Sequence, residues 1–228
     1  MMMKRLGRLL GGRRRLPVLA AVVGLALSAT SPASASTTTF TLVNAQTGYC
    51  ADLPGAYAPT LNDQLQQHDC IWGSGDNQMW YLQQVGTAAN GTIPLYWIRN
   101  TLSTPPAGGN LCLDLPGYGS DPAGTSVYTY NCTTPAGNDN QEWEVLPVIT
   151  SGGTYLGSEI RNYSDGLCLD VAGWASDGSD QVDDAKLTVY TCSNQAWADH
   201  GFDDHLWYMQ PSPGNAYIPS YAGQIIVN

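Results

Sequence analysis

The segment Asn110-Leu111-Cys112-Leu113-Asp114-Leu115 is the best guide to the fold, because the chain carries two further versions of it. The others read Gly48-Tyr49-Cys50-Ala51-Asp52-Leu53 and Gly166-Leu167-Cys168-Leu169-Asp170-Val171. Each version is followed by a second cysteine and then by a phrase that ends in tryptophan. Three copies of one pattern in the same order indicate an internal repeat, in which no single unit buries its own apolar face.

The second halves of the repeats agree as well as the first halves do. A ring stands two residues before each second cysteine, and these rings are His68, Tyr130 and Tyr190. The tryptophan phrases are spaced by 63 and 64 residues, and they read Gln78-Met79-Trp80, Gln141-Glu142-Trp143 and His205-Leu206-Trp207. The repeats therefore cover approximately residues 38–93, 94–155 and 156–223.

The local pattern predicts an all-β fold. A short run that ends in Asn precedes each first cysteine, and these runs are expected strands at Phe40–Asn44, Tyr96–Asn100 and Ser158–Asn162. The chain has 25 Gly and 14 Pro, which argue against long helices. Three short units can bury their apolar faces by closing on one another. We therefore expect a closed, threefold, antiparallel barrel with hairpins, and the repeated tryptophans should point into its core.

The cysteines favour a disulfide framework. There are six, and six cysteines allow fifteen pairings. Equivalent positions in the repeats make pairing within each repeat the simplest choice, which gives Cys50–Cys70, Cys112–Cys132 and Cys168–Cys192. Disulfides form in oxidising compartments, so this prediction goes with export from the cytoplasm.

The first 35 residues resemble a secretion signal. Six basic residues occur within the first fifteen, the 12-residue apolar run Leu16–Leu27 follows, and Ala33-Ser34-Ala35 provides a small-x-small cleavage site. Twelve residues are short for a membrane anchor, which is the alternative interpretation. We expect residues 1–35 to be removed, and residues 36–228 to form one secreted, extracellular domain.

The charge of the remaining chain excludes some partners. After residue 35 there are 19 acidic residues, and the basic residues are Arg99, Arg161 and Lys186, so the formal net charge is 3 − 19 = −16. A surface of this sign repels phosphate backbones and anionic lipids. We expect no nucleic-acid partner and no membrane insertion.

Three Cys-x-Asp phrases in register with three Gln-x-Trp-type phrases resemble the ricin-type β-trefoil lectins. They are also similar to the related carbohydrate-binding modules attached to bacterial xylanases and other glycanases. The resemblance covers essentially all of residues 36–228. Three connections are longer than is usual in that family, and we expect them to be surface loops: Gln83–Ile93, Pro147–Leu156 and Ser193–Phe202. It implies a pseudo-threefold β-trefoil that binds glycan or polysaccharide through one shallow site per repeat. It also implies no catalysis and no cofactor, and we expect a monomer.

The resemblance assigns sugar-binding roles residue by residue. An Asp accepts bonds from neighbouring hydroxyls, a ring stacks on the sugar, an Asn bonds a hydroxyl, and a Gln orients the Asp. In the first repeat these are Asp52, His68, Asn77 and Gln78, and in the second they are Asp114, Tyr130, Asn140 and Gln141. The third repeat keeps Asp170 and Tyr190, but has Asp204 and His205 in place of Asn and Gln.

The chemistry of these residue types supports the same roles. A ring covers the C–H face of a pyranose, and a carboxylate accepts several charge-assisted bonds. We expect the second repeat to bind galactose- or xylose-containing glycans, because ring, carboxylate and amide coincide there. The first repeat stays open because His stacks less well, and the third is expected to be structural because Asp204 would lie near Asp170. In each repeat the alternative is that Asp caps a turn and the ring only covers the barrel.

Other clusters have simpler interpretations. The acidic stretch at 177–184 could bind calcium, but it is explained more simply as a solvated loop. Asp199-His200 with 203–205 could bind a transition metal, but His205 is explained more simply by a changed Gln-x-Trp phrase. We therefore expect no metal. Glu142 and Glu144 flank Trp143, so both should face outward, side by side, which does not suit glycoside hydrolysis.

An alternative function is a trefoil with decayed sugar sites that acts through protein contacts, as an inhibitor or toxin component. The sequence leaves the place of Gln224–Asn228 open.

Overall fold

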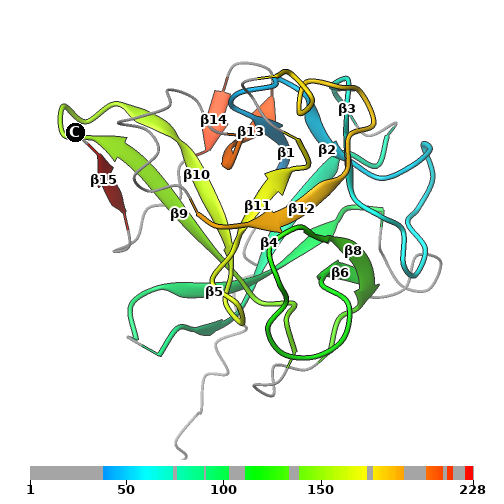
Figure 1. Cartoon of the computed structure of the whole chain (residues 1–228), viewed down its shortest axis with the longest axis horizontal. Coiled ribbons are helices and arrows are strands. Elements are labelled where there is room, and N and C mark those ends of the chain that lie inside the picture. Colours follow the sequence, from blue (N-terminus) through cyan, green and yellow to red (C-terminus); the bar gives the residue numbers. More distant parts are fainter. Residues whose placement is uncertain are drawn as a thin grey trace, which may run out of the picture. The chain divides into compact units, whose positions relative to one another are not determined.

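Six strands, two from each repeat, close into a barrel in the computed structural model (Figure 1). The structure describes residues 38–73, 76–89, 91–102, 111–133, 139–173, 177–192, 204–212, 215–217 and 224–227. The expected signal segment 1–35 therefore lies outside the described residues. The barrel strands are β1 (Thr39–Asn44), β4 (Met79–Thr87), β5 (Pro94–Asn100), β9 (Trp143–Thr150), β10 (Tyr155–Asn162) and β13 (Leu206–Ser212). Each pairs antiparallel with the next, and β13 pairs with β1, which closes the ring.

Three hairpins, one from each repeat, meet at an approximate threefold axis. They are β2 (Cys50–Asp52) with β3 (Gln66–His68), β6 (Leu111–Asp114) with β8 (Tyr128–Asn131), and β11 (Cys168–Val171) with β12 (Leu187–Tyr190). The short strand β7 (Thr125–Ser126) joins β12. A cycle of backbone hydrogen bonds links the repeats: Leu65 N donates to Val127 O, Val127 N to Leu187 O, and Leu187 N to Leu65 O. This arrangement is the expected β-trefoil, and every regular element of the described residues is a strand.

The repeated tryptophans form a layer of the core, as expected. Trp80, Trp143 and Trp207 are each 0% exposed. Each indole N–H donates to the backbone carbonyl one residue after the first cysteine of its own repeat, on Ala51, Leu113 and Leu169, at 3.1 to 3.2 Å. The indole thus fills the barrel and satisfies its polar atom, which a buried Trp requires.

The Asn that ends each opening strand has a structural role. In Asn44 and Asn162 the side-chain N–H donates across to the carbonyls of Asp204 and Asn140, at 2.6 and 2.5 Å. Asn100 makes the equivalent bond to Asn77 O. The side-chain oxygen of each Asn accepts the backbone N–H two residues further on, as in an Asx turn. One side chain therefore ends a strand and joins neighbouring repeats at once.

The three disulfides pair within the repeats, as predicted: Cys50–Cys70, Cys112–Cys132 and Cys168–Cys192. Each crosslinks the strand that carries the Asp to the loop that leads to the tryptophan phrase. Closing such loops restricts the unfolded chain, which stabilises a small domain.

Two expectations about surface regions are corrected. The stretches Gln83–Ile93 and Pro147–Leu156 were expected to be loops, but β4 continues to Thr87 and β9 continues to Thr150, so both lengthen hairpins. The third expected loop, 193–202, lies outside the described residues. Glu144 was expected to face outward, but it is 4% exposed and binds Arg161 at 2.6 Å. Arg161 lies directly opposite Glu144 on the neighbouring strand β10, and the ion pair offsets the burial of the charge.

The C-terminal segment lies outside the barrel ring. Strand β15 (Ile225–Val227) pairs parallel with β9, from Ile225 opposite Val148 to Val227 opposite Thr150 (Figure 1). β1 keeps its place between β13 and β4, so the last segment is an added strand and does not compete with the first. Strand β14 (Asn215–Tyr217) pairs with β13. Within the part of the chain that the structure describes, no helix has the length and apolar character needed to cross a bilayer.

Candidate functional site

The predicted Asp and ring of each repeat lie on one face of its hairpin. The first cysteine pairs with the ring residue, so the Asp, two positions along, pairs with the residue two before the ring. Alternate residues of a strand share a face, so carboxylate and ring are neighbours on the face that looks away from the core. The matched sets are Asp52, Gln66 and His68; Asp114, Tyr128 and Tyr130; and Asp170, Thr188 and Tyr190.

The residue opposite the Asp was missed in the sequence. Gln66 donates to Asp52 Oδ2 at 2.9 Å, and Thr188 donates to Asp170 Oδ2 at 2.8 Å. The second repeat has Tyr128 at this place. The signal was available, because a residue two before the ring on a strand shares the face of the ring. The residue at this position determines how many lone pairs of the Asp carboxylate already accept hydrogen bonds within the protein.

The Gln of each Gln-x-Trp phrase is fixed behind the Asp. Gln78 accepts from Ile71 N at 2.8 Å and donates to Asp69 O at 3.0 Å, and its N–H also reaches Asp52 Oδ1 at 3.3 Å. Gln141 likewise accepts from Thr133 N and donates to Asn131 O. Both amides are buried, so each holds its carboxylate from below while remaining out of reach of a ligand.

The Asn before each Gln has partners other than a sugar hydroxyl. Asn77 is 1% exposed, and its N–H donates to the carbonyls of Leu53, Gly55 and Tyr57. Asn140 is 0% exposed and donates to Asp121 Oδ2 at 3.0 Å and to Gly119 O at 3.4 Å. In both repeats the Asn therefore holds the loop that follows the Asp.

The second repeat has the least committed carboxylate. Among the described residues, Gln141 is the only hydrogen-bond donor to the Asp114 side chain. Burial raises the pKa of Asp114 to about 7; the Gln141 bond lowers it, and the charges of Asp139 and Asp121 add to the rise. Tyr130, on the same face, is 41% exposed. A carboxyl group with spare lone pairs therefore lies beside an exposed ring.

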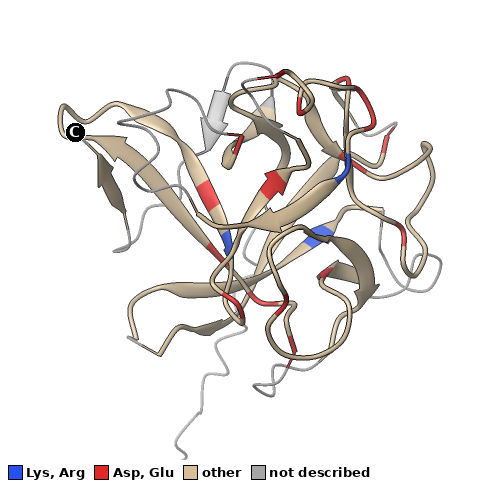
Figure 2. Cartoon of the chain, in the orientation of Figure 1, with Lys and Arg blue, Asp and Glu red and all other residues tan. Residues whose placement is uncertain are grey.

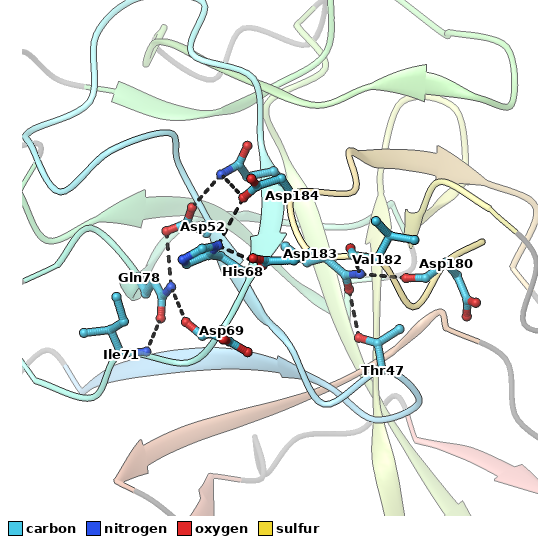
Figure 3. Close-up of polar contacts among 12 residues, drawn as sticks. Thr47, Asp52, His68, Asp69, Ile71, Gln78, Asp180, Val182, Asp183 and Asp184 are labelled. Atoms are coloured by element: carbon cyan, nitrogen blue, oxygen red, sulfur yellow. Dashed lines mark hydrogen bonds and ion pairs between the residues drawn. The ribbon is translucent and has the colours of Figure 1, made fainter. Parts of the chain in front are cut away.

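The first repeat is connected to an insertion of the third (Figure 3). His68 Nδ1 lies 2.8 Å from Asp183 Oδ1 and 3.1 Å from Asp184 Oδ1. Gln66 donates both to Asp52 and to Asp184. Burial alone would lower the pKa of His68, but Asp183 and Asp184 raise it overall, so the imidazole is held as a cation over a wider pH range.

The acidic insertion is also fastened by its backbone. Gln67 donates its side-chain N–H to the carbonyls of Asp180 and Val182, and its backbone carbonyl accepts from Asp184 N. Thr47 fixes the other end of the Gln67 amide at 2.8 Å. The stretch 177–184 is therefore a docked loop that contacts the first repeat. The sequence predicted a solvated acidic loop and gave no sign of this contact.

In the first repeat the Asp itself is more fully bonded. Burial raises the pKa of Asp52, while the bonds from Gln66 and Gln78 oppose that rise. Because two amides bond Asp52 and two carboxylates bond His68, both predicted ligand-binding groups of this repeat already have internal partners. Figure 2 marks acidic positions on loops as well as on strands, and in the sequence after residue 35 they far outnumber the three basic residues.

In the third repeat a histidine takes the place of the Gln. His205 Nε2 lies 3.3 Å from Asp170 Oδ1, much as Gln78 does from Asp52, and His205 Nδ1 lies 3.7 Å from Asp204 Oδ1. Asp170, Asp204 and His205 are all less than 9% exposed, while Tyr190 is 42% exposed. The ring is present, but its carboxylate is enclosed by Thr188 and His205.

Two of these groups place metal-type ligands together. They are His68 with Asp183 and Asp184, and Asp170 with Asp204 and His205, with ligand atoms within 4.8 Å of one another. The bonds above account for both groups as ion pairs and hydrogen bonds. The Asp199-His200 pair of the sequence prediction lies outside the described residues.

One β-trefoil thus carries three related hairpins, each with an Asp and a ring on the same face. The model of the ricin-type beta-trefoil lectin domain matches residues 38–197. The chain therefore belongs to the ricin-type β-trefoil lectin family, whose domains bind carbohydrate and are not catalytic. No curated protein matches the chain.

Solved structures support the fold. The designed threefold-symmetric protein ThreeFoil matches with a TM-score of 0.55 and 23% identity, covering 76% of this chain and 98% of its own. The mdaA-1 domain matches with a TM-score of 0.54 and 12% identity, covering 78% of this chain and 91% of its own. The Rhizoctonia solani agglutinin matches with a TM-score of 0.50 and 15% identity, covering 79% of this chain and 99% of its own. At these identities the likeness concerns the fold alone.

Proposed function

We propose that this chain is a secreted lectin that binds galactose- or xylose-containing glycans, chiefly through the second repeat. The observation that carries the proposal is the pairing of Asp114, bonded by one amide, with the exposed ring of Tyr130 on the same hairpin face. The carboxylate accepts two neighbouring hydroxyls, and the ring covers the C–H face of the sugar. Secretion is supported by the signal-like segment and by the three disulfides.

The roles of the other predicted residues follow from their contacts. Gln141 orients Asp114, and Asn140 holds the adjoining loop. The equivalent groups of the first repeat are Asp52, His68, Asn77 and Gln78, and they form a weaker site because Asp183 and Asp184 hold His68. Asp170 and Tyr190 contribute little to binding, because Thr188 and His205 hold Asp170.

A second candidate function is a trefoil that acts through protein contacts as a monomer. It is favoured by the internal partners of the ligand-binding groups in the first and third repeats. The two candidates differ in one respect that is easily measured, since only the lectin binds isolated glycans.

Tyr130→Ala should weaken binding to a glycan array about tenfold, because the variant loses the stacking ring and the apolar contact that the ring makes with the sugar. The oxidised protein is applied to galactosides and xylans beside the variant. Tyr190→Ala is the matched control, since its ring is equally exposed, at 42%, and it should change binding less than twofold. Equal losses in both variants would contradict a dominant second repeat. Absence of binding by the folded wild type would favour the protein-contact function.

Glycan affinity should rise with pH through about 7. Asp114 accepts hydroxyl donors with both oxygens only when it is ionised, and its pKa is raised to about 7. Below that pKa the affinity should fall by up to about tenfold per pH unit, because binding then requires loss of a proton. Isothermal titration between about pH 5.5 and 8.5 measures this slope. A flat profile would show that Asp114 does not carry the binding.

A further inference from the structure

Each of the first two repeats carries a second tyrosine that is almost fully exposed. Tyr57 is 82% exposed and Tyr118 is 81% exposed, about twice the value for Tyr130. Both lie in the Pro-Gly loop that follows the site Asp, five residues after Asp52 and four after Asp114. The third repeat has Trp174 at the corresponding position, which lies outside the described residues. One exposed ring is ordinary, but two successive repeats each present one in the loop that follows the site Asp.

The loops that present these rings are tied to the sugar sites. Asn77 donates to Gly55 O and to Tyr57 O, and Asn140 donates to Gly119 O, next to Tyr118. The following residue in each repeat is the Gln that bonds the site Asp. A single buried Asn-Gln pair therefore fixes the carboxylate and the loop with the second ring together.

The loops leave the rings accessible. Gly55 and Gly117 adopt φ of 80° and 88°, a conformation that side chains other than Gly rarely adopt, so each loop makes a sharp turn. Gly117 and Gly119 flank Tyr118 and carry no side chain that could cover its ring. In the first repeat the Tyr57 ring packs back on the turn, since a methyl group on Gly55 would lie 3.6 Å from Tyr57 Cδ2. Both rings remain largely exposed, and the ring of Tyr118 has only glycines as its chain neighbours.

We propose that Tyr118, and Tyr57 in the first repeat, form a second aromatic subsite that stacks on a neighbouring sugar of a glycan chain. The inference rests on the proposed function and names its ligand class as oligosaccharides instead of single sugars. Four residues of chain reach at most about 14 Å, so the Tyr118 backbone lies within the length of a short oligosaccharide from Asp114. The first sugar then occupies the Asp114 and Tyr130 site, and the next one covers Tyr118.

The test compares short and long ligands. Wild type, Tyr118→Ala and Tyr118→Phe are titrated with xylose against xylotetraose, and with galactose against a galactotetraose. Tyr118→Ala should lower tetrasaccharide affinity about five- to tenfold and change monosaccharide affinity less than twofold. Tyr118→Phe should keep the wild-type values, since it retains the ring. Val182→Ala, exposed at 54% on another loop, is the matched control and should change neither.

The outcomes separate this inference from the proposed function. Equal losses for monosaccharide and tetrasaccharide would overturn the second subsite and place Tyr118 in the first one. Unchanged tetrasaccharide affinity in Tyr118→Ala would overturn it while leaving the lectin function in place. Absence of binding to any of these ligands by the folded wild type would overturn both. Because the ring is exposed, the thermal midpoint of Tyr118→Ala should equal that of wild type, which checks folding.

Discussion

Asp114→Asn should weaken glycan binding about 100-fold and at the same time make the domain more stable above pH 7. The binding loss follows from replacing a carboxylate by an amide that accepts through one oxygen only. Two charge-assisted hydrogen bonds become weaker, at a cost of about 1.5 kcal/mol each, which together amounts to about 100-fold. Titration of the variant with the best ligand of the array measures it.

The stability gain follows from the raised pKa of Asp114. Its pKa is about 7 in the folded protein and 3.8 in the unfolded chain. The folded state therefore favours the protonated form, and the contribution to stability is lost as pH rises through the folded pKa. Asn does not ionise, so the free energy of unfolding of the variant should exceed that of wild type by roughly 2–4 kcal/mol at about pH 8. The difference should be much smaller near pH 4. Urea unfolding at both pH values measures the difference.

The matched control is Asp170→Asn. Thr188 and His205 already bond this carboxylate, so its replacement should change glycan affinity less than twofold. If Asp114→Asn bound normally, or if both variants lost binding equally, the assignment of the main site to the second repeat would be wrong. A variant that binds poorly but is more stable would show that this carboxylate serves binding at the expense of stability.

The second large effect concerns the core. Trp143→Ala should lower the free energy of unfolding by about 3–5 kcal/mol, because it leaves a cavity in the layer of three tryptophans. Trp143 is 0% exposed, and its indole satisfies the carbonyl of Leu113 at 3.2 Å, one residue before Asp114. The midpoint of urea unfolding, at an unchanged slope, measures the loss.

Trp72 provides the comparison within the same chain. It is 39% exposed and lies outside the tryptophan layer, so Trp72→Ala should cost less than about 1 kcal/mol. A small effect of Trp143→Ala would mean that the repeats do not share one core. The reverse order of the two variants would contradict the assignment of the Gln-x-Trp tryptophans to the interior.

Much of the fold could be predicted because the repeat determines it three times. The tryptophans, the paired cysteines and the strands that end in Asn each occur at equivalent positions, and each has a local physical reason. The lengthened hairpins escaped prediction because the polar stretch Gln83-Gln84 resembles a loop, although its strand is stabilised by pairing with β5. The parallel position of β15 depends on β9, more than 70 residues earlier, and no local pattern indicates it.

The candidate site was predictable where neighbours on a hairpin make it. Asp114 and Tyr130 follow from strand alternation, but the partners of Asn77 and Asn140 depend on how a loop folds back. The contact of His68 with Asp183 joins residues 115 positions apart, and no repeat of the pattern could reveal it. The structure is therefore needed for contacts that occur in only one repeat and for side chains whose partners lie in loops.

The cycle of hydrogen bonds through Leu65, Val127 and Leu187 has a consequence for how the chain matures. Each N–H in the cycle needs a carbonyl from another repeat, and the last member comes from the third. A chain that is made from its N-terminus therefore holds two unfinished repeats until the third repeat has appeared, including strand β13 (Leu206–Ser212), which closes the barrel. Folding is then completed in one late, cooperative step, and slow emergence prolongs the time during which apolar surfaces remain open to aggregation.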